Sequence, residues 1–453
     1  MNEDNYLDTP IYYQKKKISH FVPKVAKTRY LQVPKLLLLN DFKEAFVDSL
    51  KHPINSLSLN DMIASNYRLG KPIVILIDDN TRPNIHTRSL LPTLKKYLLE
   101  CGVKRNDIRL LIATGTHIPP TPEQIKQNIL GPLFEDWRDY IWIHNCDDIN
   151  NHEYLGESSL GTPILIDKRA FESSIIIPLS DSEYHYFAGV AGSVKLFVPG
   201  ISARKTVRVN HSRIFDIETG FRKECRMGNV EGNISISDIR EIVHTLTHKY
   251  GVKIFVIDAI MHNGKFFSIN AGDPLSIHDK ALQELSKIRN VPISKKADLV
   301  IVSKPSVDFY QAGKGINAAS HAVKQGGTII LLAECSEGYG PDDYFETMKR
   351  VKELSFKEAM RWVIMNKCSE TTFEIGIQNT VDIFRILQLT GGQIFVMSQM
   401  DPVELQEIFR VSTLPSSLPQ EALRMFIETF LEKTPSALIY VFEDYNILSI
   451  YSP

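Results

Sequence analysis

The residues best suited to chemistry in this chain lie between Glu183 and His211. This stretch holds two histidines, His185 and His211, together with Lys195 and a glycine-bearing turn. A histidine can accept and return a proton near neutral pH or bind a metal, and a lysine amine can form a covalent bond. The stretch therefore predicts acid/base work, metal ligation or a covalent attachment.

A second polar motif, Asp78 to Pro83, directly follows an apolar run. In open α/β sheets ligands bind beyond the carboxyl ends of strands, so Asp79, Thr81 and Arg82 are expected to face a crevice. The Arg82 guanidinium can bind a carboxylate or phosphate through two hydrogen bonds. A polar turn with an internal Asp to Arg pair explains the motif equally well.

A third motif, Ala113 to His117, also follows an apolar run. Its small residues let the backbone approach a ligand while the imidazole of His117 points into the cleft. A lone histidine after a strand is more often an ordinary loop residue, but two such loops at neighbouring strand ends build one cleft. We therefore expect His117 and His185 to serve two faces of one substrate.

His211 has no second histidine or cysteine at a zinc-binding spacing. If it binds a metal, most of the ligands must come from a non-protein group. In the second half of the chain, Gln311 and Lys314 can complete an anion site, with a capped helix start as the plain alternative. Cys335 lacks a partner histidine in sequence, so we expect a small buried thiol there.

Apolar, β-branched runs recur between amphipathic stretches and predict strands buried on both faces of mainly parallel sheets. These runs are 73–77, 108–112, 140–143, 174–177, 254–257, 299–302, 328–332, 393–397 and 437–441. Apolar residues at helical spacing predict helices over 89–100 and 273–290. This alternation of strands and helices predicts an α/β architecture.

The length of 453 residues exceeds what one core usually supports, so two α/β domains are expected. We place an N-terminal domain at 1–288, which carries the lysine and the histidines, and a C-terminal domain at 289–453. The net charge of −1 argues against nucleic acid or an anionic membrane as the main partner. The basic run 15–17 is expected to lie solvated in a polar N-terminal extension.

The cysteines and the N-terminus bear on the compartment. Five widely separated cysteines without a Cys-x-x-Cys pair suggest neither a disulfide framework nor a structural zinc site. The first residues lack an apolar signal core, and no aliphatic run approaches the roughly 20 residues that span a bilayer. We expect a soluble, cytoplasmic protein with no membrane partner.

Taken together and in this order, the motifs resemble the nickel-dependent lactate racemase family. The resemblance covers most of the chain and rests on Asp-x-Thr-Arg-Pro, Ala-Thr-Gly-Thr-His, His-x-Phe-Ala-Gly followed by Lys, Asn-His, Tyr-Gln-Ala-Gly-Lys and Ala-Glu-Cys-Ser-Glu-Gly. It implies two α/β domains with an interdomain active-site cleft. It also implies an isomerase, a racemase or epimerase of a 2-hydroxy acid such as lactate, which works by reversible hydride transfer to a covalently tethered nickel-pincer nucleotide.

The resemblance further implies the role of each site residue. Lys195 matches the lysine that tethers the cofactor through a thioamide, and His211 matches the histidine that ligates nickel. His117 and His185 match the two acid/base histidines. The other contacts it implies are Asp79, Thr81, Arg82 and Tyr310 to the cofactor, and Arg82, Gln311 and Lys314 to the substrate.

The chemistry of a 2-hydroxy acid gives an independent reason for such a set. The proton on the α-carbon beside an ionised carboxylate is very weakly acidic, so racemisation by simple deprotonation would require a much stronger base than a histidine. Removal of a hydride avoids the carbanion and leaves a planar 2-keto acid, which can accept hydride on its other face. Ni(II) favours a square-planar ligand set, which one imidazole and a three-donor cofactor would complete.

One departure from the family keeps other readings open. The family usually has Gly-Gly before its lysine, whereas this chain has Gly192, Ser193 and Val194, so a side chain stands where the turn is expected to need positive φ. A cofactor-free ligand-binding homologue is therefore one alternative. An NAD-dependent 2-hydroxyacid dehydrogenase is a weaker one, because no Gly-x-Gly-x-x-Gly follows a predicted strand. The expected partners are the small 2-hydroxy acid and the proteins that make and load the cofactor, and a homodimer is left open.

Overall fold

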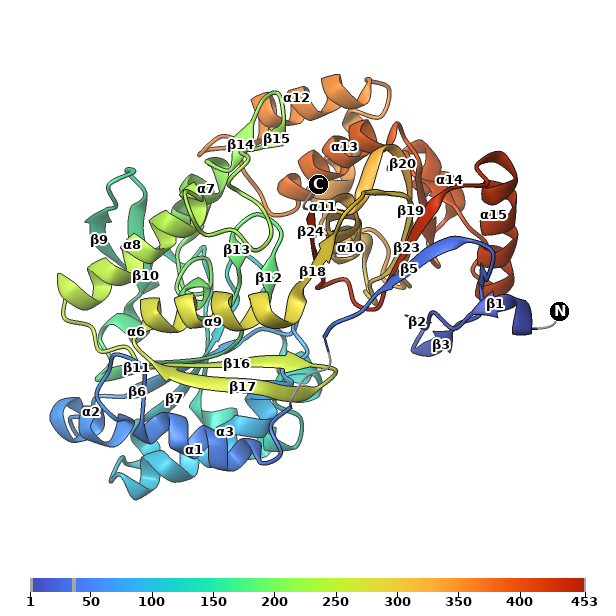
Figure 1. Ribbon diagram of the computed structural model, residues 1–453. Coiled ribbons are helices and arrows are strands. Elements are labelled where there is room, and N and C mark those ends of the chain that lie inside the picture. Colours follow the sequence, from blue (N-terminus) through green and yellow to red (C-terminus); the bar gives the residue numbers. More distant parts are fainter. Residues whose placement is uncertain (1–2, 35–37, 452–453) are drawn as a thin grey trace. The chain divides into compact units, whose positions relative to one another are not determined.

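The structure is a computed structural model that describes residues 3–34 and 38–451. The chain forms two compact units (Figure 1). Among the described residues, unit 2 holds 38–214 and 224–287, and unit 1 holds 3–34, 215–223 and 288–451.

Unit 2 is built on a six-stranded sheet whose order is β17-β16-β11-β6-β7-β8. Neighbouring strands run parallel, except that β17 is antiparallel to β16. The strands are β6 (Ile73–Asp78), β7 (Ile108–Ala113), β8 (Ile141–Ile143), β11 (Ile175–Asp181), β16 (Val256–His262) and β17 (Lys265–Gly272).

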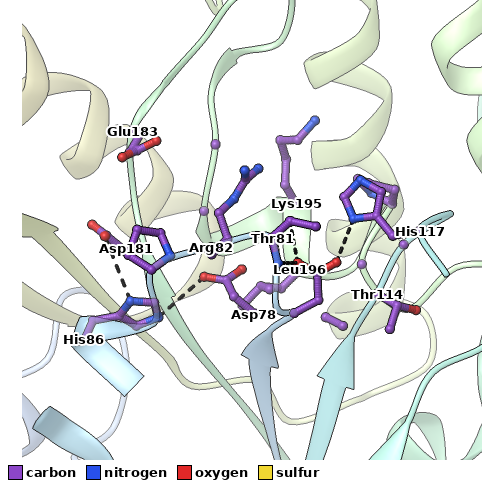
Figure 2. A pocket seen from close by; sticks show the side chains of 18 residues that line it. Asp78, Thr81, Arg82, His86, Thr114, His117, Asp181, Glu183, Lys195 and Leu196 are labelled. Atoms are coloured by element: carbon purple, nitrogen blue, oxygen red, sulfur yellow. Dashed lines mark hydrogen bonds and ion pairs between the residues drawn. The ribbon is translucent and has the colours of Figure 1, made fainter. Parts of the chain in front are cut away.

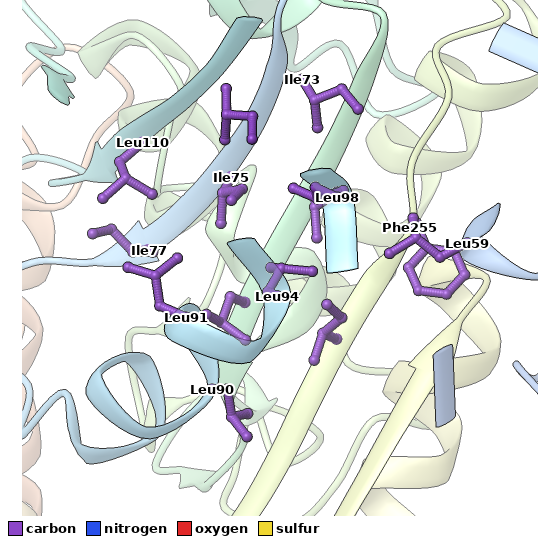
Figure 3. Close-up of a cluster of buried hydrophobic side chains, with 14 of the residues drawn as sticks. Leu59, Ile73, Ile75, Ile77, Leu90, Leu91, Leu94, Leu98, Leu110 and Phe255 are labelled. Atoms are coloured by element: carbon purple, nitrogen blue, oxygen red, sulfur yellow. The ribbon is translucent and has the colours of Figure 1, made fainter. Parts of the chain in front are cut away.

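Both faces of this sheet are covered by apolar side chains, which is why its strands are nearly continuous apolar runs. On one face, Leu90, Leu94 and Leu98 pack on Ile73, Ile75 and other strand residues (Figure 3). On the other face, Ile239 and Val243 pack with Val74 and Leu76. The helices of eight or more residues assigned to this unit are α1 (Phe42–Lys51), α2 (Leu59–Asn66), α3 (Ile85–Glu100), α7 (Arg204–Ser212), α8 (Ile234–His248) and α9 (Pro274–Arg289).

Unit 1 is built on a second six-stranded sheet, in which all neighbouring strands run parallel in the order β22-β21-β20-β19-β23-β5. Its strands are β5 (Lys27–Leu31), β19 (Ala297–Ser303), β20 (Val323–Leu332), β21 (Ile394–Met397), β22 (Ser412–Thr413) and β23 (Leu438–Phe442). Its helices are α10 (Phe309–Ser320), α11 (Asp342–Arg350), α12 (Phe356–Lys367), α13 (Ile377–Thr390), α14 (Pro402–Glu407) and α15 (Pro419–Lys433).

The fold class is confirmed, because both units are mixed α/β with mainly parallel sheets. Each of the nine apolar runs overlaps a strand, and the two predicted helices overlap α3 and α9. The division of the chain differs from a single break near residue 288. Residues 27–31 and 215–223 lie with unit 1, because β5 pairs with β23 and the hairpin of β14 (Phe215–Asp216) and β15 (Gly220–Phe221) packs beside α13.

The N-terminal segment is only partly the solvated extension that its lysines suggested. Lys15, Lys16 and Lys17 are exposed, as expected. Ile11 and Ile18, however, are buried in the core of unit 1, because the hairpin of β2 (Ile11–Tyr13) and β3 (Lys16–Ile18) places one face against that core. No helix in the described part of the chain is both long and apolar enough to cross a membrane.

Candidate active site

A pocket opens where three neighbouring strands of unit 2, β11, β6 and β7, reach their carboxyl ends (Figure 2). Parallel strands end at the same edge of a sheet, so loops that are distant in sequence meet there. Five of the predicted site residues line this pocket: Asp79, Thr81, Arg82, His117 and Lys195.

Asp79 and His117 form a hydrogen-bonded pair on the pocket wall. The Asp79 Oδ2 lies 2.6 Å from the His117 Nδ1, and Asp79 Oδ1 accepts hydrogen bonds from the Thr81 amide at 3.0 Å and the Thr81 hydroxyl at 2.6 Å. Burial alone would raise the pKa of Asp79, but the charge and hydrogen bond of His117, with the Thr81 bond, lower it below its usual value. The ionised carboxylate therefore holds the ring proton on Nδ1 and leaves the Nε2 lone pair as a base.

The turn that carries Asp79 and Arg82 is fixed by Asn84. Its side-chain Nδ2 donates to the Asp79 carbonyl at 2.7 Å and to the Arg82 carbonyl at 3.0 Å. Asn84 itself has a left-handed backbone, φ +54°, which asparagine tolerates better than most residues. The polar turn is thus internally bonded and still lines the pocket.

A second backbone contact joins the His117 loop to the segment that follows Lys195. The Gly115 amide donates to the Gly200 carbonyl at 2.9 Å. Gly115 has φ +57°, and a Cβ there would lie 3.3 Å from the Pro199 Cβ, so a glycine suits this approach. The two loops consequently support each other at the pocket.

Lys195 lies in a short 3-10 helix, Ser193–Leu196, and the residue is partly buried where it lines the pocket. Burial, with the positive charge of Arg82 adding to it, lowers the pKa of Lys195 to about 7. Among the described residues no carboxylate forms an ion pair with this amine, and its Nζ lies 5.3 Å from the centroid of the Phe187 ring. A large neutral fraction near pH 7 makes the amine a competent nucleophile.

Phe187 brings the remaining histidines to the same lysine. Its ring centroid lies 4.5 Å from that of His185 and 5.2 Å from that of His211. Neither histidine is among the described residues that line the pocket. Phe187 is nonetheless a shared neighbour of His185, His211 and Lys195, so the four residues form one connected cluster.

The two predicted acid/base histidines present opposite proton states. The His185 Nδ1 accepts a hydrogen bond from the Ala188 amide at 3.2 Å, so a neutral ring carries its proton on Nε2. His117 has its proton on Nδ1, as argued above. One ring therefore offers a hydrogen-bond donor at Nε2, and the other offers a lone pair.

His211 lies on α7 and is buried. Burial, followed by the charge of Lys195, lowers the pKa of His211 well below its usual value, so the ring is neutral as a metal ligand must be. The neighbouring Asn210 ties α7 to α8, because its Nδ2 donates to the Ser235 carbonyl at 3.0 Å and to the Asp238 carboxylate at 2.8 Å. These bonds anchor the turn of α7 that carries His211.

Metal ligands are scarce around His211. Nowhere in residues 3–34 and 38–451 do three or more His, Cys, Asp or Glu side chains gather so that they could hold a metal ion. A metal at His211 would take most of its ligands from a bound group, as the sequence also indicates.

Sequence reasoning did not single out the polar residues at the opposite end of the pocket from His117 (Figure 2). His86 lies 3.5 Å from the Asp78 carboxyl and 3.9 Å from the Asp181 carboxyl. Burial lowers the pKa of His86 to about 4, and burial raises the pKa of Asp78 to about 7 against the charge of Arg82. The pair with Asp78 is therefore largely uncharged between about pH 4 and pH 7. The sequence did carry an indication of these residues, because Asp78 and Asp181 are the last residues of two adjacent strands, β6 and β11.

The predicted residues of the second half lie on unit 1. Tyr310, Gln311 and Lys314 all belong to α10. The Tyr310 hydroxyl accepts a hydrogen bond from the Gln378 side chain at 3.1 Å. The backbone N–H of Gln311 donates to the Asp308 carboxylate at 2.6 Å, which caps the start of α10. Their assignment to cofactor and substrate stays a prediction.

Cys335 is the small buried thiol that the sequence suggested. It is 1% exposed, and burial raises the pKa of its thiol to about 12. A thiol in this state is a poor nucleophile.

Comparison with known proteins adds to this geometry. A family model described as the lactate racemase N-terminal domain matches residues 13–220, and one described as the lactate racemase C-terminal domain matches residues 293–435. The chain is 29% identical over 310 residues to a lactate racemase of Thermoanaerobacterium thermosaccharolyticum, a match that covers 67% of this chain and 68% of that protein. It is 28% identical over 365 residues to a lactate racemase of Lactiplantibacillus plantarum, which covers 80% and 81%.

Two solved structures share the fold. The lactate racemase apoprotein of Thermoanaerobacterium thermosaccharolyticum aligns with a TM-score of 0.80 at 24% identity, over 98% of this chain and 100% of that one. A protein from Thermotoga maritima aligns with a TM-score of 0.66 at 15% identity, over 92% and 100%.

Proposed function

This chain belongs to the lactate racemase family, and we propose that it interconverts the two enantiomers of a 2-hydroxy acid, lactate or a related acid. It is thus an isomerase. The observation that carries the proposal is the pocket where Lys195, Arg82 and the His117–Asp79 pair meet.

We assign Lys195 and His211 to a nickel-pincer nucleotide. The assignment is supported by the lowered pKa of the amine, by the buried neutral imidazole and by the lack of a three-residue metal cluster among the described residues. Lys195 would hold the group through a covalent bond, and His211 would ligate its nickel. When bound, this group supplies a centre that accepts a hydride from the substrate and returns it.

His117 is the residue that takes the hydroxyl proton in this scheme. Its Nε2 lone pair is oriented by the hydrogen bond from Nδ1 to Asp79, which also stabilises the imidazolium that forms. We assign the hydrogen-bond donor for the substrate oxygen to the Nε2 of His185, which reaches the site beside Phe187, the neighbour of Lys195, rather than from the lining of the pocket. For the opposite enantiomer the roles exchange, which requires the hydrogen bond from Ala188 to His185 to open.

The substrate carboxylate needs a cation, and Arg82 lines the pocket beside His117 and Lys195. Its planar guanidinium can bind a carboxylate through two hydrogen bonds and hold it as a pivot while the planar 2-keto acid turns. Gln311 and Lys314 remain the predicted partners of the same carboxylate.

The proposal is tested with full-length protein made in a host that carries the cofactor-synthesis proteins. Intact mass is expected to show added mass at Lys195, and metal analysis is expected to show nickel. Chiral chromatography over a panel of 2-hydroxy acids that includes lactate is expected to show interconversion of enantiomers. A Lys195→Ala protein is the control and should lack the added mass and the activity.

Other outcomes point to the alternatives. Wild-type protein with neither added mass nor nickel, and no isomerisation of any acid, would favour a ligand-binding homologue. Net formation of a 2-keto acid on addition of free NAD would favour a dehydrogenase. Interconversion that persists in Lys195→Ala protein would exclude the tether.

A further inference from the structure

A buried carboxyl group outside the pocket lies beneath the loop that leads to Lys195. Asp258 is on β16, is 1% exposed, and faces Ser180 of β11 directly in the register of the two parallel strands. The Ser180 hydroxyl donates to the Asp258 Oδ1, and the Ser182 hydroxyl oxygen lies 2.9 Å from the same atom. One carboxyl oxygen thus gathers two serines at the end of β11.

These two serines in turn hold the backbone on either side of Gly192. The Ser180 hydroxyl oxygen accepts a hydrogen bond from the Ser193 amide at 3.0 Å. The Ser182 hydroxyl donates to the Ala191 carbonyl at 2.9 Å. The Gly192 carbonyl then accepts from the Lys195 amide at 2.8 Å, so the chain of contacts ends at the lysine.

The backbone at Gly192 packs closely against this hydrogen-bond network. A Cβ at Gly192 would lie 2.3 Å from the Ser182 Oγ and 3.2 Å from the Asp258 Oδ1, and Gly192 has φ +83°. Ser193 has φ +34°, in the left-handed region that disfavours a side chain. The hydrogen bond from its amide to Ser180 helps to offset that strain.

We infer that Asp258 is a positioning residue for Lys195, which acts through Ser180 and Ser182 on residues 191–193. Without the Asp258 oxygen the Ser180 hydroxyl loses its acceptor and the Ser182 hydroxyl loses its polar neighbour, so both are free to turn away from the loop. Ser193 would then relax from its strained backbone and carry Lys195 with it. The consequence for the cofactor tether rests on the proposed function, whereas the effect on the loop does not.

The first test is amide hydrogen exchange of the full-length protein, followed in peptides that cover residues 191–195. Asp258→Ala and the milder Ser180→Ala are expected to exchange about five-fold faster there, since a net hydrogen bond is worth roughly 1 kcal/mol. Asp258→Asn keeps an acceptor oxygen of the same shape and should stay within about three-fold of wild type.

Asp167→Ala is the matched control. Asp167 is also a buried carboxylate of unit 2, but its side chain is bonded to Arg169 and His144 rather than to the serines. This variant is expected to lose stability without faster exchange at 191–195. Equal acceleration in Asp167→Ala, no acceleration in Asp258→Ala, or no rescue in Asp258→Asn would each overturn the inference.

The second test is the fraction of protein that carries added mass at Lys195 after loading. We expect it to fall several-fold in Asp258→Ala and to return near the wild-type value in Asp258→Asn. Faster exchange with unchanged loading would overturn the positioning role. Wild-type protein that never carries the added mass would defeat the proposed function, and the exchange comparison would still decide the role of Asp258.

Discussion

The Asp79 carboxylate lies 2.6 Å from the Nδ1 of His117, with the carboxylate buried behind the ring and the ring at the pocket. The two residues follow adjacent strands, β6 and β7, so the hydrogen bond spans two loops of the sheet edge. Because the carboxylate fixes the ring proton on Nδ1, the orientation of the Nε2 lone pair of His117 depends on a residue behind it.

Replacement of Asp79 by asparagine is expected to lower kcat for racemisation by about 10² to 10⁴-fold while KM changes little, because an amide neither fixes the tautomer nor stabilises an imidazolium. Thr81→Val removes only the hydroxyl bond to Asp79 and should cost about ten-fold or less. Initial rates from chiral chromatography measure both effects. An Asp79→Asn protein with wild-type kcat would mean that His117 is not the base.

The reactivity of the Lys195 amine should follow its lowered pKa. Acetylation of Lys195, measured by peptide mass spectrometry during brief exposure to acetic anhydride, is expected to rise with pH, with a midpoint near 7, and to level off above about pH 8. Acetylation of a simple lysine derivative, in contrast, continues to increase beyond pH 10. Arg82→Gln removes a neighbouring positive charge and should move the midpoint upward, whereas a midpoint near 10 in the wild type would contradict the burial of this amine.

Phe187→Leu is expected to disturb the histidines as well as the core. Loss of the ring removes its contacts to His185 and His211, so nickel content and activity should fall several-fold. Truncation of a buried phenylalanine to alanine costs about 3–5 kcal/mol, and leucine should cost less. Phe255→Leu is the control, because Phe255 is a fully buried phenylalanine in the core of the same unit and should lose similar stability without loss of nickel. Urea unfolding and metal analysis compare the two, and equal nickel loss in both would assign the effect to stability alone.

The strained turn before Lys195 predicts different effects on stability for two substitutions of Ser193. Glycine relieves the φ of +34° and should change the free energy of unfolding by less than about 1 kcal/mol, since the relief is offset by a more flexible unfolded chain. Valine, whose branched Cβ is most restricted there, should destabilise by about 2 kcal/mol or more. Denaturant unfolding of the two variants checks this, and a valine protein as stable as wild type would show that the turn is not strained.

The buried Asp258 predicts a pH dependence of stability. Burial raises its pKa to about 7, against 3.8 for the ordinary carboxyl. The folded protein holds the Asp258 proton more tightly than the unfolded chain does, so protonation of Asp258 stabilises the fold. This stabilisation is fully present below about pH 4 and is lost as the pH rises through 7. The stability of Asp258→Asn relative to wild type should therefore increase from pH 4 to pH 8 by at most about 4 kcal/mol and then stay level. Urea unfolding at a series of pH values measures it, and a difference that is constant over this range would contradict the shift.

Much of the fold followed from the sequence because strands buried on both faces must be apolar throughout, as Ile73 to Ile77 are. β5 escaped prediction because it is an edge strand, and four of its five residues, among them Lys27 and Arg29, keep some exposure to solvent. The N-terminal hairpin escaped for a related reason, since its exposed lysines conceal the buried Ile11 and Ile18.

The candidate site was predicted as a set of strand ends, and its internal contacts were not. Position after a strand suggested that Asp79 faces the crevice, but its partner His117 is set by the order of β6 and β7, which no local pattern encodes. Phe187 stood in a recognised motif, yet its role as a shared neighbour depends on how His211 arrives from α7. Asp258 offered one signal, a lone carboxylate within an apolar strand.

The pairing of β5 with β23 joins two strands that lie more than 400 positions apart in the sequence. A fragment that began at residue 288 would keep β19 beside β23 but lack β5, leaving a row of open peptide groups on the far side of β23 that invites pairing with other chains. The hairpin of β14 and β15 would be missing as well. Neither unit is therefore encoded by one uninterrupted stretch of this sequence, and expressing either alone requires joining separate segments.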